Sequence, residues 1–351
     1  MSDLVLSVKL KTLTPLWTGD TNRNSGVAQE SGLLGSLRFW YEGILRGAGV
    51  CACDPVEGHC PEREPCQACI LFGSAGRARA FRLEIDGLRD IPLSLRFGAR
   101  SSIETRTWLQ KTFCWDKATE TMRTGTRMLW GPDFTLTMRV SARAPDPERV
   151  RSLLLYTLLT AATEGGIGAK TQNGFGQVRL VFVNSARPDD GQIRARGREI
   201  VSSMPQATPD QIKDTADLFS LAPGRFFSFL WEIPTAPYMT QGSIDVPETA
   251  HELEHFCRPC AFEIRYKDSA GQGLWPALER ALGLSRTKAI LGSANSASRV
   301  HVSHLYSEPN MVCRLKVWGD VPEAGQIRAG MESLFTHWDR HPRLIRQFER
   351  P

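Results

Sequence analysis

Five of the nine cysteines fall within residues 51–69, a polar and proline-rich stretch. Four of them have the spacing C-x6-C-x5-C-x2-C: Cys53, Cys60, Cys66 and Cys69. Thiolates so close in sequence bind zinc as a tetrahedron, and a site filled by four cysteines leaves no position for a catalytic water. We therefore predict a structural zinc site within residues 50–70, with Cys51 and His59 as spare donors.

Other potential metal ligands are less clearly grouped. Cys257 and Cys260 form a second CxxC pair. No further cysteine pair lies near them, so they are interpreted either as a metal site or, preferably, as reduced core thiols. His301 and His304 are three residues apart, which on a strand places them on opposite faces and argues against a shared metal.

A glycine-rich loop is predicted at residues 165–176, where five of twelve positions are glycine. Glycines let backbone N–H groups approach a polyanion closely, and Lys170 adds a cation. A tight connection between helix and strand is the alternative, but the length of the loop and its lysine favour a ligand. The segment lacks the GKS/T of a P-loop and follows a helix, unlike a dinucleotide fingerprint. The predicted contacts are Gly168, Lys170, Gln172 and Asn173, whereas Phe175 either stacks on a base or, preferably, is buried.

Thirty-four of the 43 basic residues are arginines. Arginine binds phosphate bidentately and stacks on bases, so this bias favours a nucleic-acid partner, although a GC-rich genome would also produce it. Arg38 lies in a helix that the sequence predicts over residues 32–49, and it either contacts phosphate or pairs with Glu42. Arg77 and Arg79 alternate on a predicted strand and so share one face, which either presents two guanidinium groups to a nucleic-acid backbone or is simply solvated.

Residues 101–130 lack a clean period and are rich in threonine, arginine and tryptophan, which predicts a protruding arm. Basic residues interleaved with aromatic ones, such as Arg106 with Trp108, suit single-stranded RNA, whose bases stack on rings while cations hold phosphates. Alternatively, the arm buries its tryptophans on a neighbouring subunit. Residues 76–130 carry nine arginines and two lysines against six acids.

No arrangement of residues predicts catalysis. Asp20, in a polar loop, lacks a second acid or a clear base beside it, and no Ser–His–Asp or Cys–His pattern stands out.

With 351 residues, of which 41% are hydrophobic, the chain is long enough to bury a sizeable core in one large domain or two ordinary ones. The formal net charge is only +5. No apolar run is long enough to span a membrane, and the N-terminus alternates like a strand instead of forming a signal peptide, so we expect a cytoplasmic protein in which disulfides are disfavoured.

The hydrophobic pattern predicts the elements that position these residues. In chain order they are a strand at 4–14, a helix at 32–49, a strand at 78–85, a weaker strand at 93–97, a strand at 134–140, a helix at 145–164 and a strand at 175–183. Strand, helix, strands, helix, strand is the split βαβ plan of ferredoxin-like or RNA-recognition folds.

The second half reads as a degenerate copy of the first. Pro15–Thr18 is echoed by Pro237–Thr240, and Leu71–Ser74 is echoed by Ile290–Ser293 at a similar separation. The predicted fold is therefore α+β, with tandem ferredoxin-like (RRM-like) domains, a zinc-binding insertion and a protruding arm. The predicted units are an N-terminal domain at 1–185, with the insertion at 50–70 and the arm at 101–130, a polar linker at 186–215 and a C-terminal domain at 216–351.

Four motifs in this order carry a family resemblance. They are TPLWTG (14–19), GLLGSLRFWYEGILRG (32–47), residues 66–74 followed by GRAR, and GGIGAKTQNGFGQV (165–178). Over residues 5–180 the chain resembles the RAMP superfamily of CRISPR RNA-binding proteins, and within it the first-named RAMP subunit of type III-B Cmr effector complexes.

The resemblance implies a subunit that caps the 3′-side end of the crRNA in a ribonucleoprotein and contacts guide or target RNA without cutting it. It implies crRNA, target RNA and other RAMP subunits as partners, with no small-molecule substrate. Related backbone subunits carry a cleaving aspartate near the position of Asp20, but the resemblance favours a non-catalytic residue here. The alternative is a metal-independent endoribonuclease that processes repeat RNA, in which Asp20 or a histidine acts on the 2′-hydroxyl.

Overall fold

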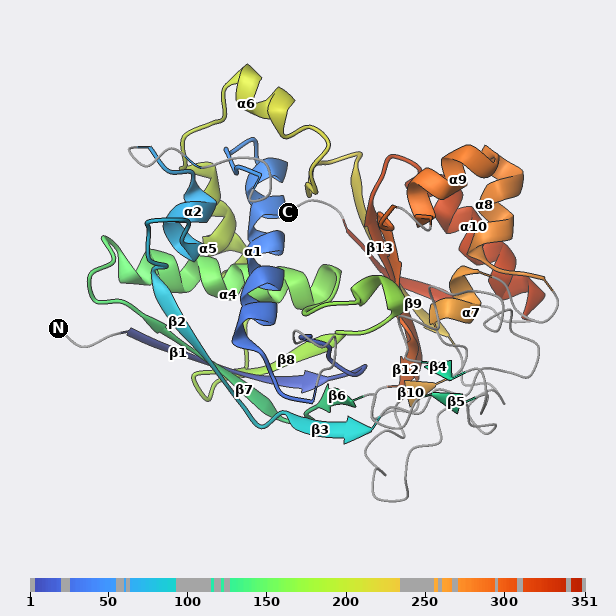
Figure 1. The fold of residues 1–351 in the computed structure, drawn as a ribbon, viewed down its shortest axis with the longest axis horizontal. Helices are drawn as coiled ribbons and strands as arrows, with labels where there is room; N and C mark the ends of the chain where they lie inside the picture. Colours follow the sequence, from blue (N-terminus) through green and yellow to red (C-terminus); the bar gives the residue numbers. More distant parts are fainter. Residues whose placement is uncertain are drawn as a thin grey trace.

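The computed structural model of the chain describes residues 4–19, 26–54, 60, 64–92, 115–116, 121–122, 127–233, 256–257, 261–266, 271–293, 296–307, 312–338 and 342–348. Helices are combined with antiparallel sheets, which confirms the predicted α+β class (Figure 1). Two sheets contain most of the strands, and each is covered by its own helices.

The first sheet has the strand order β2-β7-β1-β8, and all neighbouring strands are antiparallel. Its strands are β1 (Leu4–Thr12), β2 (Phe81–Asp86), β7 (Phe134–Val140) and β8 (Val178–Val183). Helices α1 (Glu30–Gly47) and α4 (Pro147–Glu164) lie on one side of the sheet (Figure 1). In β1 every second residue is buried, and Leu6, Val8 and Leu10 join the helices in the first hydrophobic core.

The second sheet has the order β10-β12-β13-β9-β14, with β11 also paired to β13. Its strands are β9 (Phe226–Ile233), β10 (Phe256–Cys257), β11 (Val300–Val302), β12 (Leu305–Ser307), β13 (Cys313–Asp320) and β14 (Arg343–Gln347). The helices of this half are α7 (Ala261–Arg265), α8 (Leu274–Leu282), α9 (Leu284–Leu291) and α10 (Ala324–His337). Residues from α8, α9 and α10 form the second hydrophobic core with the sheet.

The two halves repeat several local features. In the first half, the sheet order β2-β7-β1-β8 places the second, third, first and fourth of these strands along the chain side by side. The pairing β11-β13-β9-β14 repeats this order in the second half. A shift of register interrupts the pairing of β1 with β8 and that of β9 with β14. Gly73 and Gly292, which end α2 (Gln67–Phe72) and α9, both have a φ of 82° and begin the same turn, closed by Ser74 with Arg77 and by Ser293 with Ser296. The predicted echo at Gly73 and Gly292 therefore also appears in the backbone.

Strand β13 is buried on both of its faces. Leu315 and Val317 point into the second core, and the alternate residues Lys316 and Trp318 point toward the first half. Trp318 belongs to the first core, where its ring centroid lies 5.1 Å from that of Trp40 on α1. The two sheets are thus joined by a shared hydrophobic layer.

The end of α4 is held at this junction by a buried lysine. The Nζ of Lys316 donates to the carbonyls of Ala162 and Gly165, at 2.8 and 2.9 Å. These carbonyls lie at the C-terminus of α4, where a helix lacks internal donors and where a positive charge is favoured. Lys316 therefore ties the last turn of α4 to the middle of the second sheet.

Residues 186–215, predicted to be a linker, are largely helical. They contain α5 (Asp190–Ser202) and α6 (Pro209–Asp214). Ile200 and Val201 of α5 are buried in the first core, where α5 packs on α4. Its buried face is short and interrupted by Gly197, which fits against Tyr156, so the hydrophobic period was too weak to predict the helix.

The predicted arm ends earlier than expected. β6 (Arg127–Trp130) pairs with β3 (Arg89–Pro92), and Met128, Leu129 and Trp130 are buried in the body of the protein. Leu129 also exchanges two backbone hydrogen bonds with Leu16. A short hairpin joins β4 (Trp115–Asp116) to β5 (Thr121–Met122), and the rest of residues 93–126 lies outside the described part of the chain.

Among the helices that the structure describes, none combines the length and the apolar character needed to cross a membrane.

We expect Gly165→Ala to lower the free energy of unfolding by about 1–3 kcal/mol, because a Cβ there would lie 2.1 Å from the Trp40 ring. Gly35→Ala is the matched control on α1, where a Cβ meets nothing within 4 Å, and should raise the free energy of unfolding by about 0.5–1 kcal/mol. Urea unfolding followed by circular dichroism measures both. Equal free energies of unfolding for the two variants would contradict close packing of Gly165 against Trp40.

Candidate functional site: a four-cysteine cluster and a glycine-rich loop

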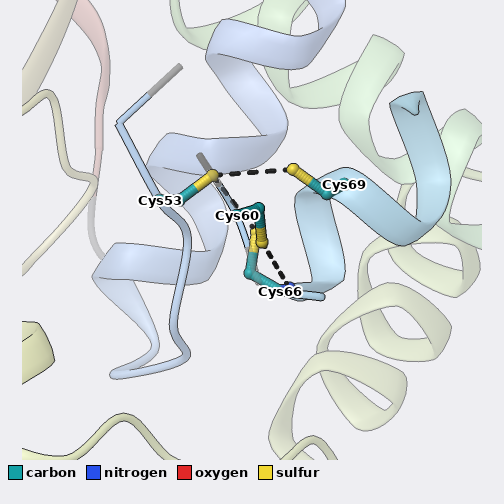
Figure 2. A group of neighbouring side chains, drawn as sticks. All are labelled: Cys53, Cys60, Cys66 and Cys69. Atoms are coloured by element: carbon teal, nitrogen blue, oxygen red, sulfur yellow. Dashed lines mark hydrogen bonds between the residues drawn. The ribbon is translucent and has the colours of Figure 1, made fainter. Parts of the chain in front are cut away.

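The four predicted zinc ligands lie together beside α1 (Figure 2). Cys66 precedes the first residue of α2 and Cys69 lies in its first turn, while Cys53 and Cys60 come from the preceding segment. All four sulfurs lie within 4.8 Å of one another. The Sγ of Cys53 is 3.5 Å from that of Cys69 and 3.6 Å from that of Cys66.

This geometry fits a tetrahedral zinc ion. Zn–S bonds of about 2.3 Å place the sulfurs of a tetrahedron about 3.8 Å apart. The separations of Cys53 from Cys69 and Cys66 are close to this value. Cys51 is half-buried but is not part of the group, and His59 lies outside the described residues. The prediction that Cys53, Cys60, Cys66 and Cys69 come together is therefore confirmed.

The crowding of the cluster changes the pKa values of Cys53, Cys60 and Cys66. The hydrogen bond between the sulfurs of Cys53 and Cys66 lowers the pKa of Cys66 and raises that of Cys53. Burial is the main cause that raises the pKa of Cys60, to about 11. The cluster thus contains one readily ionised thiol beside protonated ones, and a divalent cation would displace those protons.

Two arginines of α1 tie the cysteine segment to the core. The carboxylate of Glu42, which is almost fully buried, accepts from Arg38 at 2.7 Å and from Arg46 at 3.4 Å. Arg46 also donates to the carbonyls of Ala52 and Cys53, at 3.2 and 2.9 Å. Burial raises the pKa of Glu42, whereas the two guanidinium groups act in the opposite direction.

Arg38 uses its guanidinium group within the protein. Besides its bond to Glu42, it donates to the carbonyl of Gly73 at 2.8 Å and to the sulfur of Cys69 at 3.3 Å. All three of its nitrogens therefore have intramolecular partners. The structure favours the alternative that we considered, pairing with Glu42, over a contact of Arg38 with phosphate.

Arg77 and Arg79 do not lie on a strand as predicted. Arg77 closes the turn that follows Gly73, and Arg79 lies between this turn and β2, which begins at Phe81. The turn folds back because Ala80 donates its N–H to the carbonyl of Leu71. Arg77 is exposed and Arg79 half-buried, so the assumption of one shared strand face is wrong.

The glycine-rich loop lies where the first half meets the second. Its backbone is bonded to the segment after β1, with Ala169 N–H donating to Trp17 O and Gly176 N–H to Pro15 O, and the Trp40 indole donates to Gly166 O. On the other side, Arg265 of α7 donates to the carbonyl of Gln172 at 2.9 Å.

The glycines of this loop are required by packing. A Cβ at Gly176 would lie 2.0 Å from Ile167 O, and one at Gly174 would lie 2.6 Å from the Cβ of Ala261. Both residues also have a positive φ, which favours glycine. These close approaches account for much of the glycine content that we had attributed to a ligand.

The edge of the loop from Gly168 to Asn173 reaches the surface. Thr171–Asn173 form the short 3-10 helix η2, and Lys170, with a φ of 57°, places its Nζ 3.1 Å from the centroid of the Trp17 ring. Ala169 is exposed, and Gly168, Lys170, Gln172 and Asn173 are half-buried. Phe175 is fully buried, which confirms the preferred of our two interpretations.

The two histidines near the loop act as structural side chains. His301 stacks on Trp318 with centroids 3.8 Å apart and shares a hydrogen bond of 3.0 Å with the hydroxyl of Thr171. The Nδ1 of His304 accepts from the N–H of Ala261 at 3.1 Å. Burial lowers the pKa of each to about 3, so both imidazoles are neutral at physiological pH.

Other predicted residues lie outside the described part of the chain. These are Asp20, Arg106 and Cys260, and for Cys257 only the backbone is described. Sequence reasoning missed a different set, the arginines that line the groove between the two sheets: Arg179, Arg314 and Arg346. The available signal was a basic residue inside an otherwise apolar strand, as for Arg179 in VRLVFV.

The family comparison covers the region that contains both the cysteine cluster and the loop. The sequence model of the RAMP superfamily matches residues 9–179. The matched region includes β1, α1, the cysteine segment, α4 and the glycine-rich loop.

Solved structures resemble the chain over most of its length at low sequence identity. A type III-B Cmr-beta complex bound to cognate target RNA contains a chain with 15% identity and a TM-score of 0.45, covering 95% of this chain and 99% of that one. A chain of the same complex with AMPPnP and ssDNA has 13% identity and a TM-score of 0.46, covering 95% of this chain and 99% of that one. Apo Cmr1 from Pyrococcus furiosus has 11% identity and a TM-score of 0.47, covering 94% of this chain and 96% of that one. No curated protein matches the sequence.

Replacing Arg38 by glutamine is predicted to lower the free energy of unfolding by about 2–4 kcal/mol, since it removes one cation from a buried carboxylate and one donor from the carbonyl of Gly73. The control is Arg151→Gln, which removes an exposed ion pair with Glu148 and should change stability by less than about 0.5 kcal/mol. Denaturant unfolding distinguishes the two. A small effect at Arg38 would mean that its guanidinium is available for a phosphate after all.

Proposed function

We propose that the protein is a non-catalytic, RNA-binding subunit of a type III-B CRISPR ribonucleoprotein. In this role it caps the 3′-side end of the crRNA, contacts guide or target RNA and packs against other RAMP subunits. The observation that carries the proposal is that the model of the RAMP superfamily matches residues 9–179. The four motifs of the first half support the narrower assignment to the Cmr type.

We further propose that the fold is a tandem pair of ferredoxin-like domains. The first half supports this with its order of strand, helix, two strands, helix and strand and with its β2-β7-β1-β8 sheet. The same pairing order and the same glycine turn in the second half support an internal duplication. The boundaries 1–185 and 216–351 remain predictions.

Recognition of RNA in this proposal rests on charge and shape. Base pairing between guide and target supplies sequence specificity, so the protein needs only to hold the sugar–phosphate backbone. Within the glycine-rich loop, the surface edge formed by Gly168 and Lys170 stays a predicted contact, because it is accessible while the buried glycines serve packing.

The cysteine cluster would hold a structural zinc ion bound by Cys53, Cys60, Cys66 and Cys69. Zinc would supply the cohesion that this polar, proline-rich segment lacks, because few apolar side chains are available there to form a core. The bond from Arg38 to the sulfur of Cys69 would then stabilise a zinc-bound thiolate and fix its orientation relative to α1.

Purified protein is expected to retain about one equivalent of zinc after dialysis, and Cys69→Ser to retain far less, because a tetrahedral site loses one of its four ligands. Cys51→Ser is the matched control outside the group and should keep its zinc. Acidification should release the metal, since thiolates bind zinc and thiols do not. Metal analysis with a chromophoric chelator measures all three. Less than about half an equivalent in the wild type, or equal loss in both variants, would refute this site.

The functional proposal is tested by affinity purification of the tagged protein from its native cell, with sequencing of the bound RNA. We expect spacer-derived RNAs that share a repeat-derived tag, together with other RAMP subunits. Recovery of the protein alone with unprocessed repeat transcripts would favour the endoribonuclease instead. In that case, incubation with labelled repeat RNA should give specific cleavage that Asp20→Ala abolishes, whereas our proposal expects no cleavage by either protein.

A further inference from the structure

The first part of the glycine-rich loop, residues 166–169, is held by the first half of the protein. Gly168 donates its N–H to the hydroxyl of Ser36 on α1 at 2.9 Å. Ala169 donates its N–H to the carbonyl of Trp17 at 2.6 Å. Backbone bonds of this kind fix the path of a loop whatever its side chains are, so this part of the loop moves with the first half.

The second part of the loop, residues 171–174, is held by the second half. Arg265 of α7 donates to the carbonyl of Gln172 at 2.9 Å. The N–H of His304, between β11 and β12, donates to the carbonyl of Gly174 at 3.3 Å. The loop is therefore anchored at its two ends to different halves of the molecule.

Side chains strengthen the second anchor. The hydroxyl of Thr171 shares a hydrogen bond of 3.0 Å with the Nδ1 of His301, and this histidine stacks on Trp318. At Gly174, a Cβ would lie 2.6 Å from the Cβ of Ala261, so α7 packs directly on the loop backbone. The short helix η2 thus rests on β11 and α7 of the second half.

Lys170 lies between the two anchored parts. Its φ of 57° is in the left-handed region, which residues other than glycine seldom adopt. Its carbonyl accepts from the N–H of Asn173 and so belongs to η2, whereas its Nζ lies 3.1 Å from the centroid of the Trp17 ring in the first half. The conformation of Lys170 therefore depends on both anchors at once.

Arg265 is an unusual anchor because its guanidinium group is buried without a carboxylate. Only 3% of the residue is exposed, and no acidic side chain in the described part of the chain pairs with it. Besides the carbonyl of Gln172, it donates to the carbonyl of Leu291, the last residue of α9, where helix carbonyls lack internal donors. Its Nε has no acceptor. Burying a cation is unfavourable unless it is well bonded, so the bonds to the two carbonyls must offset that cost.

Anchoring of η2 matters for the predicted contact at Lys170. A cation that is already ordered binds a phosphate more tightly than a mobile one, because less conformational entropy is lost on binding. The region that matches the RAMP superfamily ends at residue 179 and contains the whole loop, but Arg265 lies outside it. The loop thus depends for its second anchor on a residue of the other half.

We propose that the second half, chiefly through Arg265, fixes η2 and thereby orients Lys170 for contact with RNA. Arg265 is in this view a positioning residue, which acts on the ligand only through the loop. The inference rests on the proposed RNA-binding function and gives the second half a part in it.

The first measurement is hydrogen exchange of the loop in the full-length protein, followed by mass spectrometry. Arg265→Met removes the donors of the anchor but keeps an unbranched stem that can stay buried. We expect the N–H groups of Asn173 and Gly174, which close η2, to exchange about tenfold faster. The N–H of Ala169, which is bonded to the first half, should change by less than about twofold.

The control for exchange is Arg328→Met on α10, which removes an arginine from an exposed ion pair with Glu332 and should leave the loop unchanged. Unchanged exchange of η2 in Arg265→Met, or equal acceleration throughout the loop, would overturn the anchoring. If Arg265→Met does not fold, Thr171→Val takes its place, since it loses only the hydroxyl bonded to His301. About threefold faster exchange of η2 is then expected, and unchanged exchange would again contradict the anchor.

The second measurement is binding of a fluorescein-labelled single-stranded RNA, followed by anisotropy in a double-mutant cycle. If Arg265 acts through Lys170, Arg265→Met should raise Kd about fivefold in the wild type but less than about twofold in Lys170→Gln. Thermal midpoints identify the variants that are folded. An equal rise of Kd in both backgrounds would show a general structural effect and overturn the positioning role. A wild type that binds no RNA would refute the proposed function, while exchange of η2 would still decide whether the second half anchors the loop.

Discussion

The packing of Trp40 against Gly165 and Trp318 is the contact on which the arrangement of the two halves depends. The ring of Trp40 fills the space where a Cβ of residue 165 would lie, and its indole donates to the carbonyl of Gly166. The same layer continues through Trp318 to His301, which stacks on it. Because Trp40, Gly165 and Trp318 are buried and fit closely, the halves share one closely packed boundary.

Lys316 adds a polar constraint to the same boundary. A buried ammonium group is costly to desolvate, and burial lowers its pKa, yet here it has two carbonyl acceptors at the end of α4. These bonds fix the last turn of α4 relative to β13, and they occupy two of the three donors of Lys316. The lysine thus ties the second sheet to the end of α4 from inside the boundary.

The sequence was sufficient where structure is local. Alternation in residues 4–14 and the apolar faces of residues 32–49 and 145–164 predicted β1, α1 and α4 to within a few residues. The cysteine spacing predicted the cluster, because these signals lie within one element or one loop. It was insufficient where the cause lies far along the chain. The glycines of residues 165–176 were interpreted as a ligand loop, since their packing partners Trp17 and Ala261 are distant in sequence. The groove escaped notice for the same reason, because its arginines come from strands of both halves.

Arginines in this protein serve two different purposes, and their surroundings distinguish them. Arg38 and Arg46 lie around one buried carboxylate and also donate to carbonyls and a sulfur, so they fix the cysteine segment to α1. Around Glu164 the balance is different, because two guanidinium groups share that carboxylate while further cations line the same space. A satisfied guanidinium group stabilises a fold, whereas an excess of them in a cleft attracts an anion. An overall arginine bias is therefore not informative about ligand binding until each side chain has been assigned to one of these two environments.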